Sequence, residues 1–244
     1  MIWEEAPAVV HATNMNRPGS KKVLPRIVTG TISLVAFTVL WFGVAGRLSW
    51  WQGWAFLLTS VAYVGLLVWR LSRSNPELLL ERSQPAEKAE SWDRIVMRIY
   101  VGLLMLLLIV SALDGGRFGW SRIPFPFQVM GWLFLVAAGA MVWHVMMINA
   151  FLSSWARIQE DRGQTVIQDG AYRYVRHPMY IGIVVAFLGI PLVLGSWWAM
   201  IPSVLIVALF VYRTYKEDRM LENGLAGYVE YKEKVRYRLL PRIW

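Results

Sequence analysis

The stretch FQVMGWLFLVAAGAMVWHVMMI, residues 127–148, decides the fold class of this chain. An α-helix needs about 20 predominantly apolar residues to cross the hydrocarbon core of a bilayer. The stretch meets that requirement, and His144 is its only ionisable side chain. It therefore predicts a transmembrane helix. Because His144 lies near one end, we expect it to bond to a neighbouring helix or a lipid headgroup rather than to take part in chemistry.

Further apolar stretches extend this interpretation to most of the chain. The composition is 57% hydrophobic and 17% charged, whereas soluble domains are about 25% charged. The sequence predicts an all-α integral membrane protein with about six transmembrane helices. Besides residues 127–148, the predicted spans are residues 27–46, 51–69, 95–113, 179–194 and 197–212.

The distribution of basic residues predicts the orientation in the membrane. All but three of the 25 Lys and Arg residues fall in segments that lie on one side if every span crosses; the exceptions are Arg47, Arg117 and Arg122. Basic loops usually face the cytoplasm. We therefore expect a multi-pass protein with both termini in the cytoplasm. The net charge of +9 then reflects topology and contact with anionic lipids, not nucleic-acid binding.

The same order of segments predicts one membrane domain spanning residues 1–244. It would consist of a cytoplasmic tail (1–26), four N-terminal spans (27–148) and a C-terminal half (149–244) that holds two spans and an amphipathic tail. A metal site is not expected, since the chain has no cysteine and its three histidines lack metal-ligand spacing. The oligomeric state is not predicted.

Local patterns predict the shorter elements. Asn75-Pro76 indicates a turn that starts a short helix at residues 77–82. Residues 149–163 are predicted to continue the preceding helix as far as Gly163, followed by an extended piece at 164–167. Tyr228, Tyr231 and Val235 are spaced three and four apart, which is typical of an amphipathic helix on the membrane surface. Asp114 is expected to be an ordinary loop residue.

The densest group of polar and aromatic residues is GAYRYVRHPMYIG, residues 170–182, at the start of an apolar span. Gly170 allows a turn, and Pro178 suits the first turn of a helix. The free N–H groups of a helix start favour an anion such as a carboxylate. Arg176 and His177 directly precede that helix start. The stretch therefore indicates a site for a charged ligand, and a basic interfacial anchor is the alternative.

A second polar segment follows the last span. Arg213 and Glu217 are four residues apart and share one face of a helix. Because only Gly195-Ser196 separates the two C-terminal spans, they form a hairpin, and the end of the second returns to the start of the first. His177 and Glu217 are therefore predicted to be neighbours.

Together these two motifs and the intervening hairpin resemble the isoprenylcysteine carboxyl methyltransferase family, which is related to the phospholipid N-methyltransferases. The similarity covers about residues 157–222 and extends weakly to the Asn75-Pro76 turn and the tyrosine-rich tail. Asp218 departs from the family pattern, where many members have a second Glu.

The resemblance implies a methyltransferase that uses S-adenosyl-L-methionine, bound at the cytoplasmic end of the last helices. It implies that Arg213 contacts the substrate and that Arg213, Glu217 and His177 form the catalytic group. Arg176 is a further candidate partner for the donor's carboxylate. The donor contacts expected in this way are Gln159, Gln164, Thr165, Val166, Ile167, Tyr172, Arg176, His177, Pro178, Met179, Tyr180 and Glu217.

The residue types agree with methyl transfer to a lipophilic acceptor that enters from the bilayer. A carboxylate acceptor, such as that of a prenylcysteine, is already ionised at pH 7 and needs positioning rather than a base. Arg213 suits that task because its guanidinium is planar and binds in a bidentate manner. N-methylation of an aminophospholipid is the alternative, with Glu217, Asp218 or His177 as the base; S-methylation of a thiol is another. A membrane carrier or assembly protein is the non-enzyme alternative.

Overall fold

The computed structural model describes residues 23–244, which divide into two compact units between Leu40 and Trp41. The first unit holds most of α1 (Val23–Ala45). The second, from Trp41 onward, holds all other helices and the candidate site. The predicted tail at residues 1–26 lies almost entirely outside the described residues. The division into four N-terminal spans and a C-terminal half remains a prediction.

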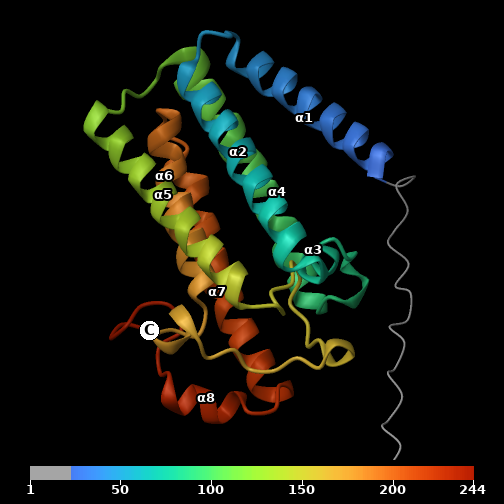
Figure 1. Ribbon diagram of the computed structural model, residues 1–244. Helices are drawn as coiled ribbons and strands as arrows, with labels where there is room; N and C mark the ends of the chain where they lie inside the picture. Colours follow the sequence, from blue (N-terminus) through green and yellow to red (C-terminus); the bar gives the residue numbers. More distant parts are fainter. Residues whose placement is uncertain (1–22) are drawn as a thin grey trace, which may run out of the picture. The chain divides into compact units, whose positions relative to one another are not determined.

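The described part of the chain contains helices and no β-strand, which confirms the prediction of an all-α fold. Short 3₁₀ turns interrupt the connections at Ala86–Lys88, Glu160–Arg162 and Gly170–Arg173. The helices after α1 are α2 (Trp51–Ser74), α3 (Pro76–Arg82), α4 (Ser91–Ser111, continued by a π-helical turn at Ala112–Phe118), α5 (Phe125–Ile148), α6 (Pro178–Leu194), α7 (Met200–Gly224) and α8 (Tyr228–Lys234) (Figure 1).

Four helical segments of the described chain are long and apolar enough to cross a membrane: Val28–Ala45, Trp51–Ser74, Ser91–Phe118 and Phe125–Ile148. Their outward faces carry large apolar side chains, as on α5, where Leu133 is 63% and Val136 68% exposed. Such surfaces are costly in water and are expected where lipid covers them. The helices therefore support an integral membrane protein.

The helices at the last two predicted spans, α6 and α7, are less regular as spans. α6 has 17 residues, fewer than a typical crossing helix. α7 joins an apolar first half to a charged second half that begins near Arg213 and ends at Gly224. Residues 200–212 of the predicted span at 197–212 thus form the first part of a longer helix, and residues 197–199 lie in the turn before it. The number of six crossings remains a prediction.

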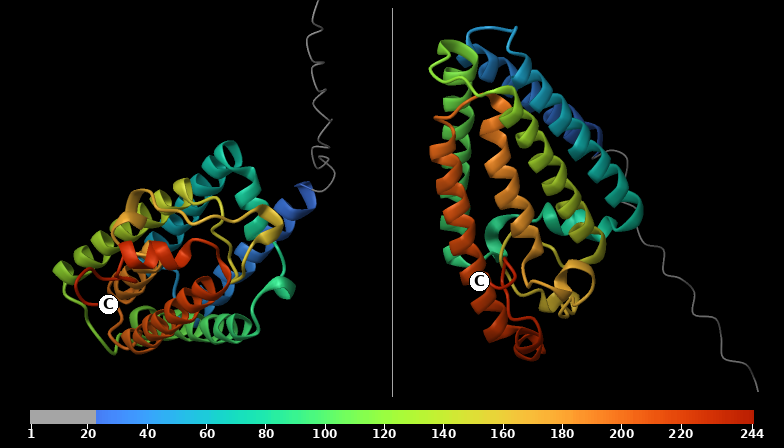
Figure 2. Two further views of the ribbon diagram at one scale, coloured as in Figure 1. Left: turned by 90° about the horizontal axis from the view of Figure 1, so that it is seen from below. Right: turned by 90° about the vertical axis from the view of Figure 1, so that its left-hand side faces the viewer.

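Glycines bring α5 and α6 close together, in the most extensive helix–helix contact of the fold (Figures 1 and 2). A Cβ atom at Gly131 would lie 2.8 Å from Leu192 Cβ and 2.9 Å from the Gly189 carbonyl oxygen. A Cβ at Gly189 would lie 2.8 Å from the Gly131 carbonyl oxygen. Small residues allow such backbone approach between membrane helices. This contact fixes α6, whose first turn forms part of the site.

Aromatic side chains join α4 to α6 and α7. The Tyr100 ring lies 5.2 Å from the Phe210 ring and 5.9 Å from the Phe187 ring, both edge to face. Aromatic pairs favour this geometry. As a result, the middle of α4 lies beside the middle of α7, and residues from the N-terminal half of the chain reach the site.

Asp114 is not the loop residue that the sequence predicted. It lies in the π-helical turn after α4 and is fully buried. Its carboxylate accepts hydrogen bonds from the Ser121 hydroxyl and from the Ser196 hydroxyl, the latter at 2.7 Å. Buried carboxylates need such partners. Asp114 therefore ties the end of α4 to the α6–α7 turn, at the end of the bundle away from α3 and α8 (Figure 1).

Two predicted short elements have opposite outcomes. The short helix at 77–82 is confirmed as α3, and the Asn75 side chain caps it by accepting a hydrogen bond from Leu78 N at 3.1 Å. The predicted helical continuation at 149–163 is wrong. α5 ends at Ile148, and the chain is irregular up to the 3₁₀ turn at Glu160–Arg162. Hydrogen bonds between side chains and the backbone replace helical hydrogen bonds there. For example, Phe151 N donates to Asn149 Oδ1 at 2.9 Å.

We expect Gly131→Ala to destabilise the fold and Gly102→Ala not to. A Cβ at Gly131 meets backbone of α6, which cannot move aside easily, whereas a Cβ at Gly102 on α4 meets nothing within 4 Å. Overpacking of this kind costs about 1–3 kcal/mol. Thermal unfolding of the two detergent-purified variants measures the difference. Equal melting temperatures would contradict the assigned α5–α6 contact.

Candidate functional site

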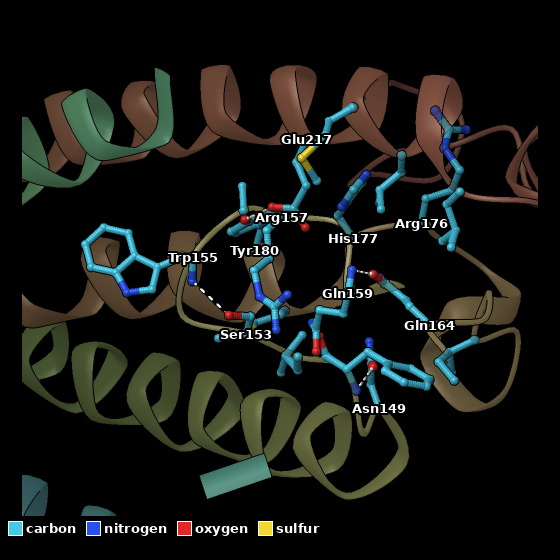
Figure 3. A pocket seen from close by; sticks show the side chains of 18 of the residues that line it. Asn149, Ser153, Trp155, Arg157, Gln159, Gln164, Arg176, His177, Tyr180 and Glu217 are labelled. Carbon is cyan, nitrogen blue, oxygen red and sulfur yellow. Dashed lines mark hydrogen bonds between the residues drawn. The ribbon is translucent and has the colours of Figure 1, made fainter. Parts of the chain in front are cut away.

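A cavity of about 290 Å³ lies where the first turn of α6, the middle of α7 and the irregular segment after α5 meet (Figure 3). Ligand pockets commonly start near this volume. Pro178, at the first position of α6, and Asp218, a candidate base for the amine alternative, are predicted site residues that do not line it. The predicted site residues that line the cavity are Gln159, Gln164, Thr165, Val166, Ile167, Tyr172, Arg176, His177, Met179, Tyr180, Arg213 and Glu217.

The fully buried carboxylate of Asp218 holds the two predicted motifs together. Arg176 donates to it with Nε and Nη2, at 2.7 and 2.8 Å. His177 Nε2 lies 3.1 Å from Asp218 Oδ1, and the Tyr228 hydroxyl donates to the same oxygen at 2.7 Å. Arg238 Nε donates to Oδ2 at 2.8 Å. Asp218 thus binds the start of α6 and the C-terminal segment to α7, while it does not itself line the cavity.

Glu217 and Tyr180 form the wall between these motifs. The Tyr180 hydroxyl donates a hydrogen bond to the Glu217 carboxylate. The prediction that His177 and Glu217 are neighbours is supported through this pair, since the His177 and Tyr180 rings are stacked with centroids 5.9 Å apart. Figure 3 shows Glu217, His177 and Tyr180 side by side on the cavity.

Arg213 is oriented by Asp93, a residue that the sequence analysis did not single out. Arg213 Nε donates to Asp93 Oδ1 at 2.7 Å, and Nη2 donates to Oδ2 at 3.0 Å and to the Ser154 carbonyl at 3.1 Å. Both side chains are buried. Its guanidinium also lies over the Tyr180 ring, 5.7 Å from the centroid. A bidentate pair fixes a guanidinium in one orientation. Asp93 is the only acidic residue in α4, and its place at the start of an apolar span was the signal that could have identified it.

The irregular segment after α5 carries amide side chains into the cavity. Gln159 N donates to Gln164 Oε1 at 2.7 Å, and Gln159 Nε2 donates to the Phe151 carbonyl at 2.5 Å. Asn149 Nδ2 donates to the Tyr172 hydroxyl at 2.6 Å. These hydrogen bonds form because the chain is not helical there. Asn149 and Phe151 also line the cavity, and the wrong helix prediction is the reason that they were not predicted to do so.

An almost buried ion pair attaches this segment to α3. Arg157 Nε and Nη2 donate to the two oxygens of Glu81 at 3.0 and 2.9 Å. Arg157 Nη1 also donates to Asp161 Oδ1 at 2.9 Å. The hydrogen bonds from Arg157 hold the pKa of Glu81 below its ordinary value. The segment thus depends on a carboxylate from the first half of the chain.

The predicted surface stripe in the C-terminal tail is wrong, because its two tyrosines are buried in the protein. Tyr228 and Tyr231 are 3% and 2% exposed, and both line the cavity. The Tyr231 hydroxyl donates to the Tyr172 carbonyl at 2.7 Å. Burial raises the pKa values of Tyr172, Tyr228 and Tyr231, so all three remain neutral phenols near pH 7. Apolar residues spaced three and four apart indicate one buried helix face, but the spacing does not show whether lipid or protein covers that face.

His144 lies outside the cavity, as predicted for a residue without a chemical role. It is exposed on α5 beside Gly170. Gly170 has φ +58°, and a Cβ there would lie 2.6 Å from His144 Nε2. Glycine is therefore required both by the left-handed backbone and by the close approach. This turn directs the chain toward the start of α6.

Comparisons with known proteins agree with the resemblance that the two motifs indicated. The sequence profile of the isoprenylcysteine carboxyl methyltransferase family matches residues 131–223. The chain is also similar to the protein-S-isoprenylcysteine O-methyltransferase of Schizosaccharomyces pombe, with 24% identity over 166 residues, or 59% of this chain and 70% of that protein. These matches confirm the resemblance and support the prediction of a methyltransferase enzyme.

We expect Asp93→Asn to destabilise the protein far more than Asp169→Asn. Removal of one partner from a buried ion pair costs about 3–5 kcal/mol, because the other charge remains buried and unpaired. Asp169 forms a comparable bond to Arg173 at 3.1 Å, but both side chains are exposed, and exposed pairs contribute little. Chemical unfolding in detergent measures both variants. Equal effects would show that Asp93 does not hold Arg213 as described.

The Glu81–Arg157 pair predicts a stability loss at low pH. Since the folded state lowers the pKa of Glu81 from 4.5, the pair stabilises the protein fully above about pH 4.5 and less as the pH falls through the lowered value. Melting temperatures between pH 7 and pH 3 should fall less steeply for Glu81→Gln than for the wild type. Parallel curves would rule out this contribution.

Proposed function

We propose, from the relationship to the isoprenylcysteine carboxyl methyltransferases, that this chain is a membrane methyltransferase that transfers a methyl group from S-adenosyl-L-methionine to a lipophilic acceptor. The acceptor is a carboxylate of a prenylcysteine or a similar amphiphile. One observation carries the proposal: Arg213, Glu217 and the His177–Tyr180 turn, which are distant in sequence, line one cavity. Both residues and the turn lie within the family match at residues 131–223.

The cavity residues fit the chemical groups of the donor. A carboxylate such as Glu217 can accept hydrogen bonds from ribose hydroxyls or the donor's amino group. Apolar residues of the α7–α8 region, including Leu221 and Leu225, offer a surface for adenine. Tyr172 and Tyr180 present aromatic faces that attract a cation such as a sulfonium by roughly 0.5–2 kcal/mol. The helix start after His177 suits the donor's carboxylate.

S-adenosyl-L-methionine, when bound, supplies an electrophilic methyl group. The protein's own task is then to hold the acceptor. A carboxylate is ionised at neutral pH and requires no proton transfer, so orientation is the main requirement. Arg213 meets it because Asp93 fixes its guanidinium while Nη1 has no protein partner among the described residues. The Tyr180–Glu217 hydrogen bond holds the Glu217 carboxylate on the cavity wall, where we expect the donor to bind.

The apolar part of the cavity supports an acceptor that comes from the bilayer. Met97 and Tyr100 of α4, Ile183 of α6 and Phe210 of α7 all line it. Since α4 is long and apolar enough to cross a membrane, these apolar lining residues support an acceptor that reaches the site from lipid. The charge distribution of the sequence supports a cytoplasmic location for the polar end, where the donor is available.

The test is binding of S-adenosylmethionine or S-adenosylhomocysteine to the detergent-purified protein, measured by calorimetry and thermal shift. We expect saturable binding to the wild type, a loss of at least tenfold in affinity for Glu217→Gln, and little change for Glu222→Gln. Glu222 also lies on α7 but does not line the cavity, and it pairs with Lys232 at 2.6 Å. A wild type that binds neither compound would refute the proposed function.

A further inference from the structure

The cavity has an excess of positive charge. Glu217 is the only carboxylate among the described residues that line it, whereas four arginines do so. Three of these arginines have buried or nearly buried carboxylate partners: Arg157 with Glu81, Arg176 with Asp218, and Arg213 with Asp93. The fourth is Arg82, and no carboxylate of the described chain lies within ion-pair distance of it.

Arg82 has a fixed place at the end of α3. Its Nη1 donates to the Leu152 carbonyl at 3.0 Å, and its own backbone carbonyl accepts from the Ser154 hydroxyl at 3.0 Å. The side chain is half-buried. A guanidinium has five N–H groups, and only one of them has a partner among the described residues. The remaining donors are available to a ligand in the cavity.

Arg82 and Arg213 influence each other electrostatically. Burial, and after it the positive charge of Arg213, lower the pKa of the Arg82 guanidinium. An arginine nevertheless remains charged at neutral pH. Two like charges that share a partly buried cavity repel each other, and an anion placed between them would attract both and outweigh that repulsion. Asp93 does not serve both, because its two oxygens are bonded to Arg213 and to Ala156 N.

We propose that Arg82 binds the carboxylate of the methyl acceptor together with Arg213, and thereby selects anionic acceptors. This inference rests on the proposed function and adds a second acceptor-binding residue, from outside the matched segment 131–223. The apolar surroundings agree with an amphiphile. The Arg213 guanidinium lies over the Phe210 ring at 5.9 Å, and that ring contacts Tyr100.

Two guanidinium groups explain how the site discriminates between acceptors. A carboxylate offers two oxygens, so each arginine can donate to it with charge-assisted bonds. An amine or ammonium group would meet two positive charges and no available carboxylate except Glu217, which already accepts from Tyr180. The proposal therefore predicts carboxyl methylation rather than amine methylation.

The experiment measures acceptor binding, which does not depend on turnover. N-acetyl-S-farnesyl-L-cysteine and its uncharged carboxamide are titrated against detergent-purified protein with S-adenosylhomocysteine present. We expect the wild type to prefer the carboxylate, and Arg82→Gln to reduce that preference about 10- to 100-fold, as for the loss of a charge-assisted hydrogen bond. Affinity for S-adenosylhomocysteine should change less than threefold. Arg173→Gln, an exposed arginine outside the cavity, is the matched control.

Two outcomes would overturn the inference. One is an unchanged carboxylate preference in Arg82→Gln. The other is a loss of S-adenosylhomocysteine affinity with the preference intact, which would assign Arg82 to the donor. Should Arg82→Gln not fold, Arg82→Lys keeps the charge but not the planar donor pair. It is expected to lower the preference about three- to tenfold, and no change would again refute the inference. Failure of the proposed function is distinct, because it appears as absent donor binding in the wild type.

Discussion

The buried carboxylate of Asp218 is the interaction on which the site depends. It accepts hydrogen bonds from Arg176, Arg238 and Tyr228 and lies within bonding distance of His177. An isolated charge in such a place would be very costly, so the carboxylate requires its partners as much as they require it. Since these partners come from the turn before α6, from α8 and from the chain end, one residue of α7 fixes the relative positions of these three segments beside the cavity.

The site as a whole repeats this design with three buried or nearly buried pairs. Asp218 orients Arg176, Asp93 orients Arg213, and Glu81 orients Arg157. Each pair joins segments far apart in the sequence. Buried pairs contribute little net stability compared with apolar packing, but their loss is severe. They therefore act mainly by fixing the geometry of the side chains around the cavity.

The all-α fold class, the spans of α2 and α5 and the convergence of Arg213, Glu217 and His177 were predictable from the sequence, because long apolar runs and a tight hairpin constrain the chain strongly. The roles of Asp93, Arg82, Tyr228 and Tyr231 were not, since a local pattern does not show which distant residues a side chain contacts in the fold. The helix predicted at 149–163 failed for a related reason. Its polar residues bond to the backbone and to α3, and this tertiary satisfaction outweighs helical propensity.

The aromatic packing of α4 against α7 has a consequence for what constitutes the smallest working unit. The segment similar to the family, residues 131–223, contains every residue that the motifs point to, yet the acid that orients its key guanidinium arrives on α4, from outside that segment. A fragment limited to residues 131–223 would keep Arg213 but lack the carboxylate that orients its guanidinium. A substitution of Asp93 on α4 therefore reaches Arg213 on α7, although the two residues lie 120 positions apart in the sequence.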